Sequence, residues 1–193
     1  MSRFLCMAHE IQNLTLMSNY FEFYSIPESF ILDEKALKNT YYKFSREYHP
    51  DFYANEPQEK QQEILQLSTQ NTNAYRTLSD PDLRMQYILK EHGMLEEGKN
   101  ELPGDFLMEM MELNEELMEL EFDFDAAKLH EIGEKSTGAM ASLDADILPV
   151  LQRYPDLHGV TKEEALEQVK TYYLKKKYLL RIQETLSKFA SRS

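Results

Sequence analysis

Apolar residues recur along most of this chain at intervals of three and four, which is the repeat of an amphipathic helix rather than of a strand. The first clear stripe consists of Leu37, Tyr41, Phe44 and Tyr48, and Asp33 stands where a helix N-cap is expected. Pro50 ends this helix, because proline disfavours the helical conformation in the residue before it. Six glycines and seven prolines are few for this length. The pattern therefore predicts an all-α fold.

A second long stripe follows after Pro57 and forms a helical hairpin with the first. Its inward residues are Ile64, Leu67, Asn71, Ala74, Tyr75 and Leu78, with Asn71 expected at a packing edge. Two shorter helices flank the hairpin. One covers Asn19 to Tyr24, and the other is capped by Ser79 or Asp80, opened by Pro81 and ended by His92-Gly93.

The second half repeats the helical pattern three times and predicts a three-helix bundle. Asp105 is expected to cap its first helix, whose seam is Phe106, Met110, Leu113, Leu117 and Leu120. The middle helix lies within residues 125–151, where Pro149 is expected to bend or end it. Thr161 is expected to cap the last helix with Glu164 as its capping-box partner. The inward residues of that helix are Ala165, Val169, Tyr172, Leu179, Ile182, Leu186 and Phe189.

These patterns divide the 193 residues into four segments. Residues 1–18 are an N-terminal extension without the basic end and apolar core of a signal peptide. Residues 19–92 form the first domain, 93–104 a polar linker and 105–193 the bundle.

The formal net charge of −13 argues against nucleic acid and anionic membranes as partners, since both are densely negative. Basic protein surfaces remain compatible with this charge. The only cysteine, Cys6, cannot form an intramolecular disulfide or a cysteine-rich metal site, which fits a reducing, cytoplasmic environment. No apolar run approaches the roughly 20 residues of a membrane span.

The tripeptide His49-Pro50-Asp51 lies at the tip of the predicted hairpin. Four cations, Lys35, Lys38, Lys43 and Arg46, precede it on the polar faces of its first helix, in a chain that is otherwise acidic. The tripeptide, the basic helix and the later series Ala74-Tyr75, Leu78, Asp80-Pro81, Arg84 and Tyr87 together resemble a J domain, the module of DnaJ-type co-chaperones. The resemblance implies that His49, Pro50, Asp51 and the four cations bind a DnaK-type chaperone and accelerate its ATP hydrolysis. Phe52 departs from the pattern, because the family often has a lysine after the aspartate.

Three apolar residues of the first bundle helix, Leu107, Met108 and Met111, fall outside its seam. They lie within a stretch from Glu101 to Asp125 that has ten acidic residues and no Lys or Arg. A wide core face with ordinary solubilising charge is one interpretation, and an apolar binding strip bordered by carboxylates is the other.

Residues 105–119 and the final Lys175-Lys-Lys-Tyr-Leu-Leu-Arg181 resemble the bundle of HscB, the J-protein family of iron–sulfur cluster biogenesis. That resemblance implies the chaperone HscA and the cluster scaffold IscU as partners. The scaffold-binding residues that it implies are Leu107, Met108, Met111, Glu112, Glu115, Glu119 and Tyr178. It implies no cofactor for the chain itself.

Catalytic alternatives have weaker support. His49 has no Cys, Ser or second His at ligand or triad spacing, a di-iron site lacks its Glu-x-x-His pairs, and no glycine-rich phosphate loop exists. We therefore expect a non-enzymatic protein without a metal, in which any ATP hydrolysis belongs to a partner. The alternatives left open are a general J-protein with a different client, a metal-dependent helical enzyme and a purely structural helical protein.

Overall fold

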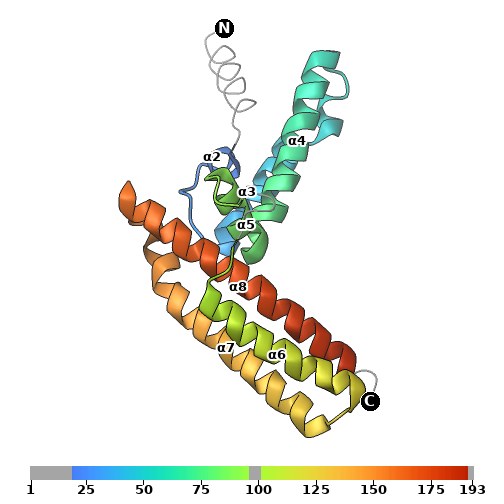
Figure 1. Ribbon diagram of the computed structural model, residues 1–193. Coiled ribbons are helices and arrows are strands. Elements are labelled where there is room, and N and C mark those ends of the chain that lie inside the picture. Colours follow the sequence, from blue (N-terminus) through green and yellow to red (C-terminus); the bar gives the residue numbers. More distant parts are fainter. Residues whose placement is uncertain (1–18, 96–100, 191–193) are drawn as a thin grey trace. The chain divides into compact units, whose positions relative to one another are not determined.

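The computed structural model describes residues 19–95 and 101–190, and every regular element in them is a helix (Figure 1). The predicted extension at 1–18 and residues 96–100 of the predicted linker lie outside this description. The chain divides into two compact units between Ile88 and Leu89. None of the helices in the described ranges combines the length and apolar content that a membrane span requires.

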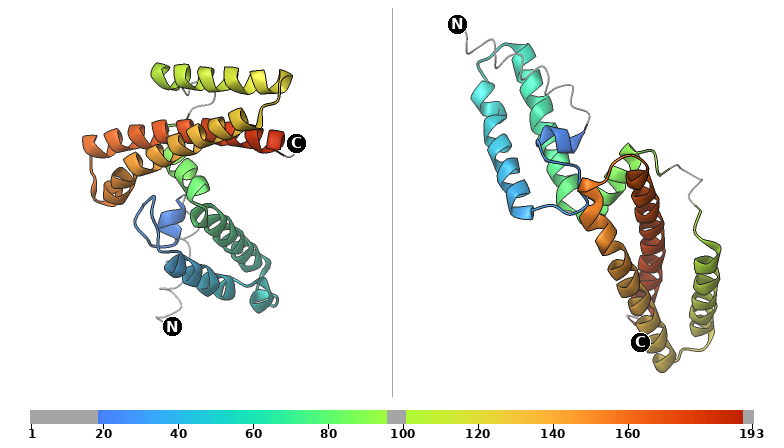
Figure 2. Two further views of the ribbon diagram at one scale, coloured as in Figure 1. Left: turned by 90° about the horizontal axis from the view of Figure 1, so that it is seen from below. Right: turned by 90° about the vertical axis from the view of Figure 1, so that its left-hand side faces the viewer.

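The first unit is a helical hairpin with short helices around it. Its elements are α2 (Tyr20–Phe23), α3 (Glu34–Glu47), the 3-10 helix η1 (Pro50–Tyr53), α4 (Gln58–Ser79) and the beginning of α5 (Pro81–Glu91). Helices α3 and α4 lie side by side and antiparallel, with η1 at their turn (Figures 1 and 2). The predicted caps are confirmed. The Asp33 carboxylate accepts hydrogen bonds from the backbone amides of Lys35 and Ala36, and the Asp80 carboxylate accepts them from the amides of Asp82 and Leu83.

Aromatic rings fill the space between α2 and the hairpin. Phe23 packs edge-on against Phe44 with their ring centroids 5.3 Å apart, and Phe44 lies 5.4 Å from Tyr48. Tyr24 and Tyr48 are almost fully buried, and this burial raises the pKa of both phenols.

Asn71 does not lie at a packing edge, and that prediction is wrong. Its side chain is buried, and its amide oxygen accepts a 2.8 Å hydrogen bond from the Tyr24 hydroxyl. Its amide nitrogen donates to the Tyr41 carbonyl at 3.2 Å and to the Ser45 hydroxyl at 3.0 Å. Asn71 therefore joins α2, α3 and α4 through polar contacts inside an apolar interface.

Arg84 is a second buried polar group of the first unit. Its guanidinium donates to the carbonyls of Phe30 and Leu78, and its burial lowers its pKa. It ties the segment before α3 and the end of α4 to α5. These structural contacts account for an arginine at this position of the J-domain series, and no binding role is needed to explain it.

The second unit contains the predicted three-helix bundle, which is confirmed. It consists of α6 (Gly104–Phe122), α7 (Ala126–Arg153), the 3-10 helix η2 (Tyr154–Asp156) and α8 (Val160–Ala190) (Figure 2). All five seam residues of α6 are buried, together with the seven predicted inward residues of α8. Ile132 of α7 forms one core with the α6 seam and with Leu179, Ile182, Leu186 and Phe189 of α8.

Two local predictions for this unit are wrong, and a third is narrowed. Helix α6 starts at Gly104, so Asp105 is already inside it. Thr161 is inside α8, because the Gly159 carbonyl accepts the Lys162 and Glu163 amides and the helix begins before Thr161. Of the two effects expected of Pro149, a bend or an end, the end is excluded, because α7 continues to Arg153.

Candidate protein-binding sites

His49, Pro50 and Asp51 are brought together in one exposed turn at the tip of the hairpin. His49 caps η1, and its Nδ1 accepts a 3.3 Å hydrogen bond from the Asp51 amide. Because Nδ1 is the acceptor, the neutral ring carries its proton on Nε2, which leaves a donor for another molecule. The Asp51 carboxylate lies 3.8 Å from Nδ1, and its side chain is 86% exposed.

The turn is anchored to both helices of the hairpin. The Tyr53 hydroxyl donates to the Glu47 carbonyl at 3.0 Å, which ties η1 back to the end of α3. From α4, the side-chain amide of Gln61 donates to the carbonyls of Ala54 and Glu56 at 3.1 and 2.8 Å. These bonds hold the backbone while the side chains of His49 and Asp51 remain accessible, which suits a recognition surface.

Phe52 extends the exposed surface of the turn. Its side chain is 71% exposed, and its ring lies 5.4 Å from the His49 ring. An apolar ring therefore stands where the J-domain pattern often has a cation. The turn presents one aromatic, one imidazole and one carboxylate side by side.

The four predicted cations all lie exposed on α3. Lys38 and Lys43 lie 5.9 and 5.8 Å from the ring centroids of Tyr42 and Phe44. None of Lys35, Lys38, Lys43 and Arg46 forms an ion pair with a carboxylate of the described residues. Their charge is therefore available to an acidic partner surface.

The second candidate site is the outer face of α6. Leu107, Met108 and Met111 are exposed there by 40%, 69% and 61%, and Glu115 is exposed near them. They point away from the core side of the helix, so the bundle does not need their apolar surface. A broad exposed apolar area bordered by charge is typical of a protein-binding surface.

Tyr178 of α8 meets α6 beside this row. Its hydroxyl accepts a 2.6 Å hydrogen bond from the Asn114 amide, and its ring packs edge-on to Phe106 at 6.0 Å. Asn114 follows Leu107 and Met111 by seven and three residues, so all three lie along one side of α6. The structure thus brings Tyr178 to the apolar row, and the half-buried ring is held by contacts that the sequence did not reveal.

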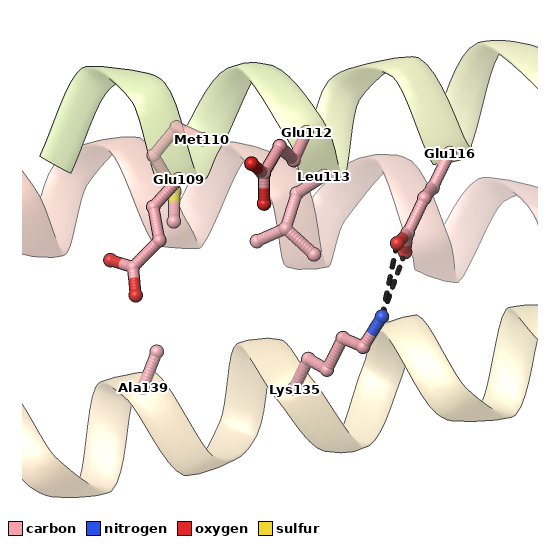
Figure 3. Close-up of a pocket in the computed structure, with 7 residues that line it drawn as sticks. All are labelled: Glu109, Met110, Glu112, Leu113, Glu116, Lys135 and Ala139. Carbon is pink, nitrogen blue, oxygen red and sulfur yellow. Dashed lines mark hydrogen bonds and ion pairs between the residues drawn. The ribbon is translucent and has the colours of Figure 1, made fainter. Parts of the chain in front are cut away.

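The predicted glutamates do not have equal surroundings. Glu119 pairs with Lys128 of α7, whose pKa is raised by this hydrogen bond. Glu112 lines a groove of about 410 Å³ between α6 and α7, with Glu109, Glu116 and Lys135 (Figure 3). Its floor is formed by Met110 and Leu113.

Within this groove only one carboxylate is paired with the lysine. Lys135 donates to Glu116 at 3.0 Å, and its second partner is Glu131 at 3.2 Å. These contacts raise the pKa of Lys135. Glu109 and Glu112 keep uncompensated charge, so this side of α6 is an acidic flank that consists of Glu109, Glu112, Glu116 and Glu119, whereas Glu115 lies on the outer face among the exposed apolar residues.

The described residues contain no group of three His, Cys, Asp or Glu side chains placed to hold a metal ion. The ionisable group beside His49 in the turn is the Asp51 carboxylate, 3.8 Å from Nδ1. Both sites present exposed side chains on helices or on a turn anchored to them, as surfaces that bind proteins do.

Family models match both halves of the chain. Residues 19–87 match the DnaJ domain, and residues 102–187 match the HSCB C-terminal oligomerisation domain. A co-chaperone protein HscB homolog from Vibrio vulnificus is 30% identical over 138 residues, which cover 70% of this chain and 75% of that protein. The homolog from Vibrio parahaemolyticus is 34% identical over 119 residues, 56% of this chain and 70% of its own.

Two solved structures have the same architecture. Human co-chaperone protein HscB matches with a TM-score of 0.65 at 26% identity, covering 89% of this chain and 82% of that one. Chaperone HscB from Vibrio cholerae matches with a TM-score of 0.55 at 27% identity, covering 87% of this chain and 99% of that one. The predicted order of a J domain followed by a helical bundle is thereby confirmed.

Proposed function

Because the chain belongs to the HscB family of J-domain co-chaperones, we propose that it couples a DnaK-type ATPase, HscA, to an IscU-like iron–sulfur scaffold. In this proposal the first unit stimulates ATP hydrolysis by the chaperone, and the bundle delivers the scaffold to it. The product of this coupling is assisted assembly and transfer of iron–sulfur clusters. The cluster is cargo of the scaffold, and the co-chaperone itself performs no covalent chemistry.

The observation that carries the proposal is the presence of two separate exposed surfaces on one chain, each built on a rigid helical scaffold. The turn of His49, Pro50 and Asp51 is held by backbone hydrogen bonds, and its side chains are free to bind. The row of Leu107, Met108 and Met111 is apolar and needs no contact within the bundle. In the proposal each surface engages a different partner, the turn the ATPase and the row the scaffold.

The proposed roles follow from chemistry. His49 and Asp51 make polar contacts with the ATPase, and Pro50 fixes the backbone between them. Lys35, Lys38, Lys43 and Arg46 steer this unit onto an acidic chaperone surface, an effect that weakens with salt. Leu107, Met108, Met111 and Tyr178 supply apolar contact with the scaffold, while Glu112, Glu115 and Glu119 orient it.

The test is the ATPase rate of the chaperone, measured with the co-chaperone alone and with the scaffold added. His49→Gln should abolish stimulation, because the ring that caps η1 and offers Nε2–H is lost. Asn55→Ser, an exposed change in the same loop, is the control and should stimulate normally. Equal stimulation by wild type and His49→Gln would refute the trigger role.

Scaffold binding is tested separately on the bundle. Replacing Leu107, Met111 and Tyr178 by Ala should weaken binding of the scaffold while leaving stimulation by the first unit intact. If binding survives this triple change, a different client or a different site is favoured. That result would support the alternative of a general J-protein.

A further inference from the structure

The exposed apolar row of α6 does not stop at Met111. Met118 and Phe122 follow it by seven and eleven residues, which places them on the same side of the helix. Their side chains are exposed by 60% and 89%. From Leu107 to Phe122 the row covers about 22 Å of helix at 1.5 Å per residue.

The bundle has no structural use for these two side chains. The core side of this part of α6 is supplied by Leu117 and Leu120, which are buried. Met118 and Phe122 lie outside that side of the helix and are absent from the core. A thioether and a phenyl ring kept in water over successive turns extend the exposed apolar area well beyond Leu107, Met108 and Met111.

The charge beside the row selects the kind of partner. The acidic flank runs along the α7 side of α6, where Lys128 and Lys135 compensate only Glu119 and Glu116. A protein that covers the row therefore meets an apolar strip with carboxylates along one border and the exposed Glu115 within it. It requires an apolar ridge with Lys or Arg beside it.

A second copy of this chain is a poor occupant by the same reasoning. The chain carries a net charge of −13, and its α6 has no cation of its own to face the flank of another copy. Pairing two such faces would bring carboxylates together, which is unfavourable.

We propose that the partner surface of the bundle extends along the full length of α6, and that Met118 and Phe122 bind the same scaffold protein as Leu107 and Met111. This inference rests on the proposed function and defines the shape of its partner, an apolar ridge bordered by basic residues and long enough to reach the end of the helix. Met108 and Met111 meet one end of that ridge, and Phe122 meets the other.

The experiment measures the Kd of the full-length chain for an IscU-type scaffold by calorimetry. The double variant Met118→Ala/Phe122→Ala should raise the Kd about tenfold, because truncating exposed anchors at an interface typically costs this much. The matched control is Leu148→Ala/Leu180→Ala, which removes exposed leucines of α7 and α8 and should leave the Kd unchanged. Thermal unfolding followed by circular dichroism checks that all variants remain folded.

The outcomes separate this inference from the proposed function. If Leu107→Ala/Met111→Ala weakens binding but Met118→Ala/Phe122→Ala does not, the extended surface is refuted and the proposed function stands. If neither pair alters the Kd, both are refuted. Sedimentation of the free chain tests whether a second copy occupies the surface. If the chain self-associates, and Met118→Ala/Phe122→Ala abolishes the self-association but leaves the scaffold Kd unchanged, the surface belongs to a second copy and the inference is overturned.

Discussion

At the scale of single residues, the side chain of Asn71 determines how three helices of the first unit meet. Its side-chain amide forms hydrogen bonds with the Tyr24 hydroxyl, the Tyr41 carbonyl and the Ser45 hydroxyl. A buried polar group of this kind is costly when its partners are lost and specific when they are present.

Replacing this amide by an apolar side chain of similar size should therefore destabilise the first unit. Asn71→Leu leaves the hydroxyls of Tyr24 and Ser45 with fewer partners and should lower the local free energy of unfolding by about 2–4 kcal/mol. Hydrogen exchange of the α3 and α4 amides measures this quantity for the unit by itself. Thr72→Leu, the exposed neighbour, should change it by no more than about 0.5 kcal/mol, and equal effects of the two changes would contradict the role of the buried amide.

Tyr48 makes the free energy of unfolding of the same unit fall as the pH becomes alkaline. Burial raises the pKa of its phenol, so the folded chain keeps a proton that the unfolded chain releases above a pKa of about 10. The stabilisation is fully present below that pH and is lost as the pH rises toward the folded pKa. The loss contributed by this group is up to about 1.4 kcal/mol per pH unit.

Tyr48→Phe should remove that contribution and flatten the decline. The measurement is urea unfolding of wild type and variant at pH 9, 10 and 11, with the difference in their slopes as the readout. Tyr42→Phe removes a phenol from the exposed side of α3 and controls for the change in composition. Parallel pH profiles for wild type and Tyr48→Phe would show that the buried phenol does not control alkaline stability.

At the scale of helices, the apolar period predicted which residues are buried but not always where a helix begins. The seam of α6 and the inward row of α8 follow directly from spacing, because burial of one helix face imposes that spacing. Asp33 and Asp80 cap through their own carboxylates, a local interaction that sequence can reveal. At α8 the Gly159 carbonyl begins the helix, so the cap-like Thr161 lies inside it and instead donates to the His158 carbonyl.

Long-range contacts explain the remaining differences. The hydrogen-bond partners of Asn71 lie 26 to 47 residues away in the sequence. Because the sequence does not reveal such distant partners, a polar residue in an apolar row was predicted to lie at the edge of the packing. The pairing of Glu119 with Lys128 depends on how the turn between α6 and α7 aligns these helices. The prediction of an apolar row near Met111 came from spacing, and the same spacing continues to Met118 and Phe122.

The lysines of α7 should restrain the acidic flank of α6. Lys128 pairs with Glu119, and Lys135 pairs with Glu116, so removing both ammonium groups exposes more negative charge to a basic partner. Lys128→Gln/Lys135→Gln should lower the scaffold Kd about threefold at low salt, mainly through faster association.

The control for this change has the same net charge but places it elsewhere. Lys170→Gln/Lys188→Gln removes two lysines of α8 that pair with Glu167 and Glu184, and it should alter the Kd much less. Association rate constants are measured by stopped flow from low salt to about 0.5 M salt. The rate constants of all variants should become equal at high salt, since salt screens exposed charge. A gain that is equal for both double variants would mean that net charge matters and the flank does not.

At the scale of the whole molecule, the proposed function depends on both surfaces belonging to one chain. When the scaffold is bound to the bundle, its local concentration at the chaperone is set by the chain that joins the two units rather than by the solution. A protein with only one working surface can stimulate or bind, but it cannot bring the two partners together.

Mixing two full-length variants tests this dependence without cutting the chain. His49→Gln keeps the proposed scaffold surface, and Leu107→Ala/Met111→Ala keeps the proposed trigger. An equimolar mixture should give scaffold-dependent ATPase stimulation at least about tenfold below wild type at the same total concentration, because no chain in it carries both surfaces. Restoration of the wild-type rate by the mixture would mean that the surfaces act independently, and a chain carrying all three substitutions sets the background rate against which both results are measured.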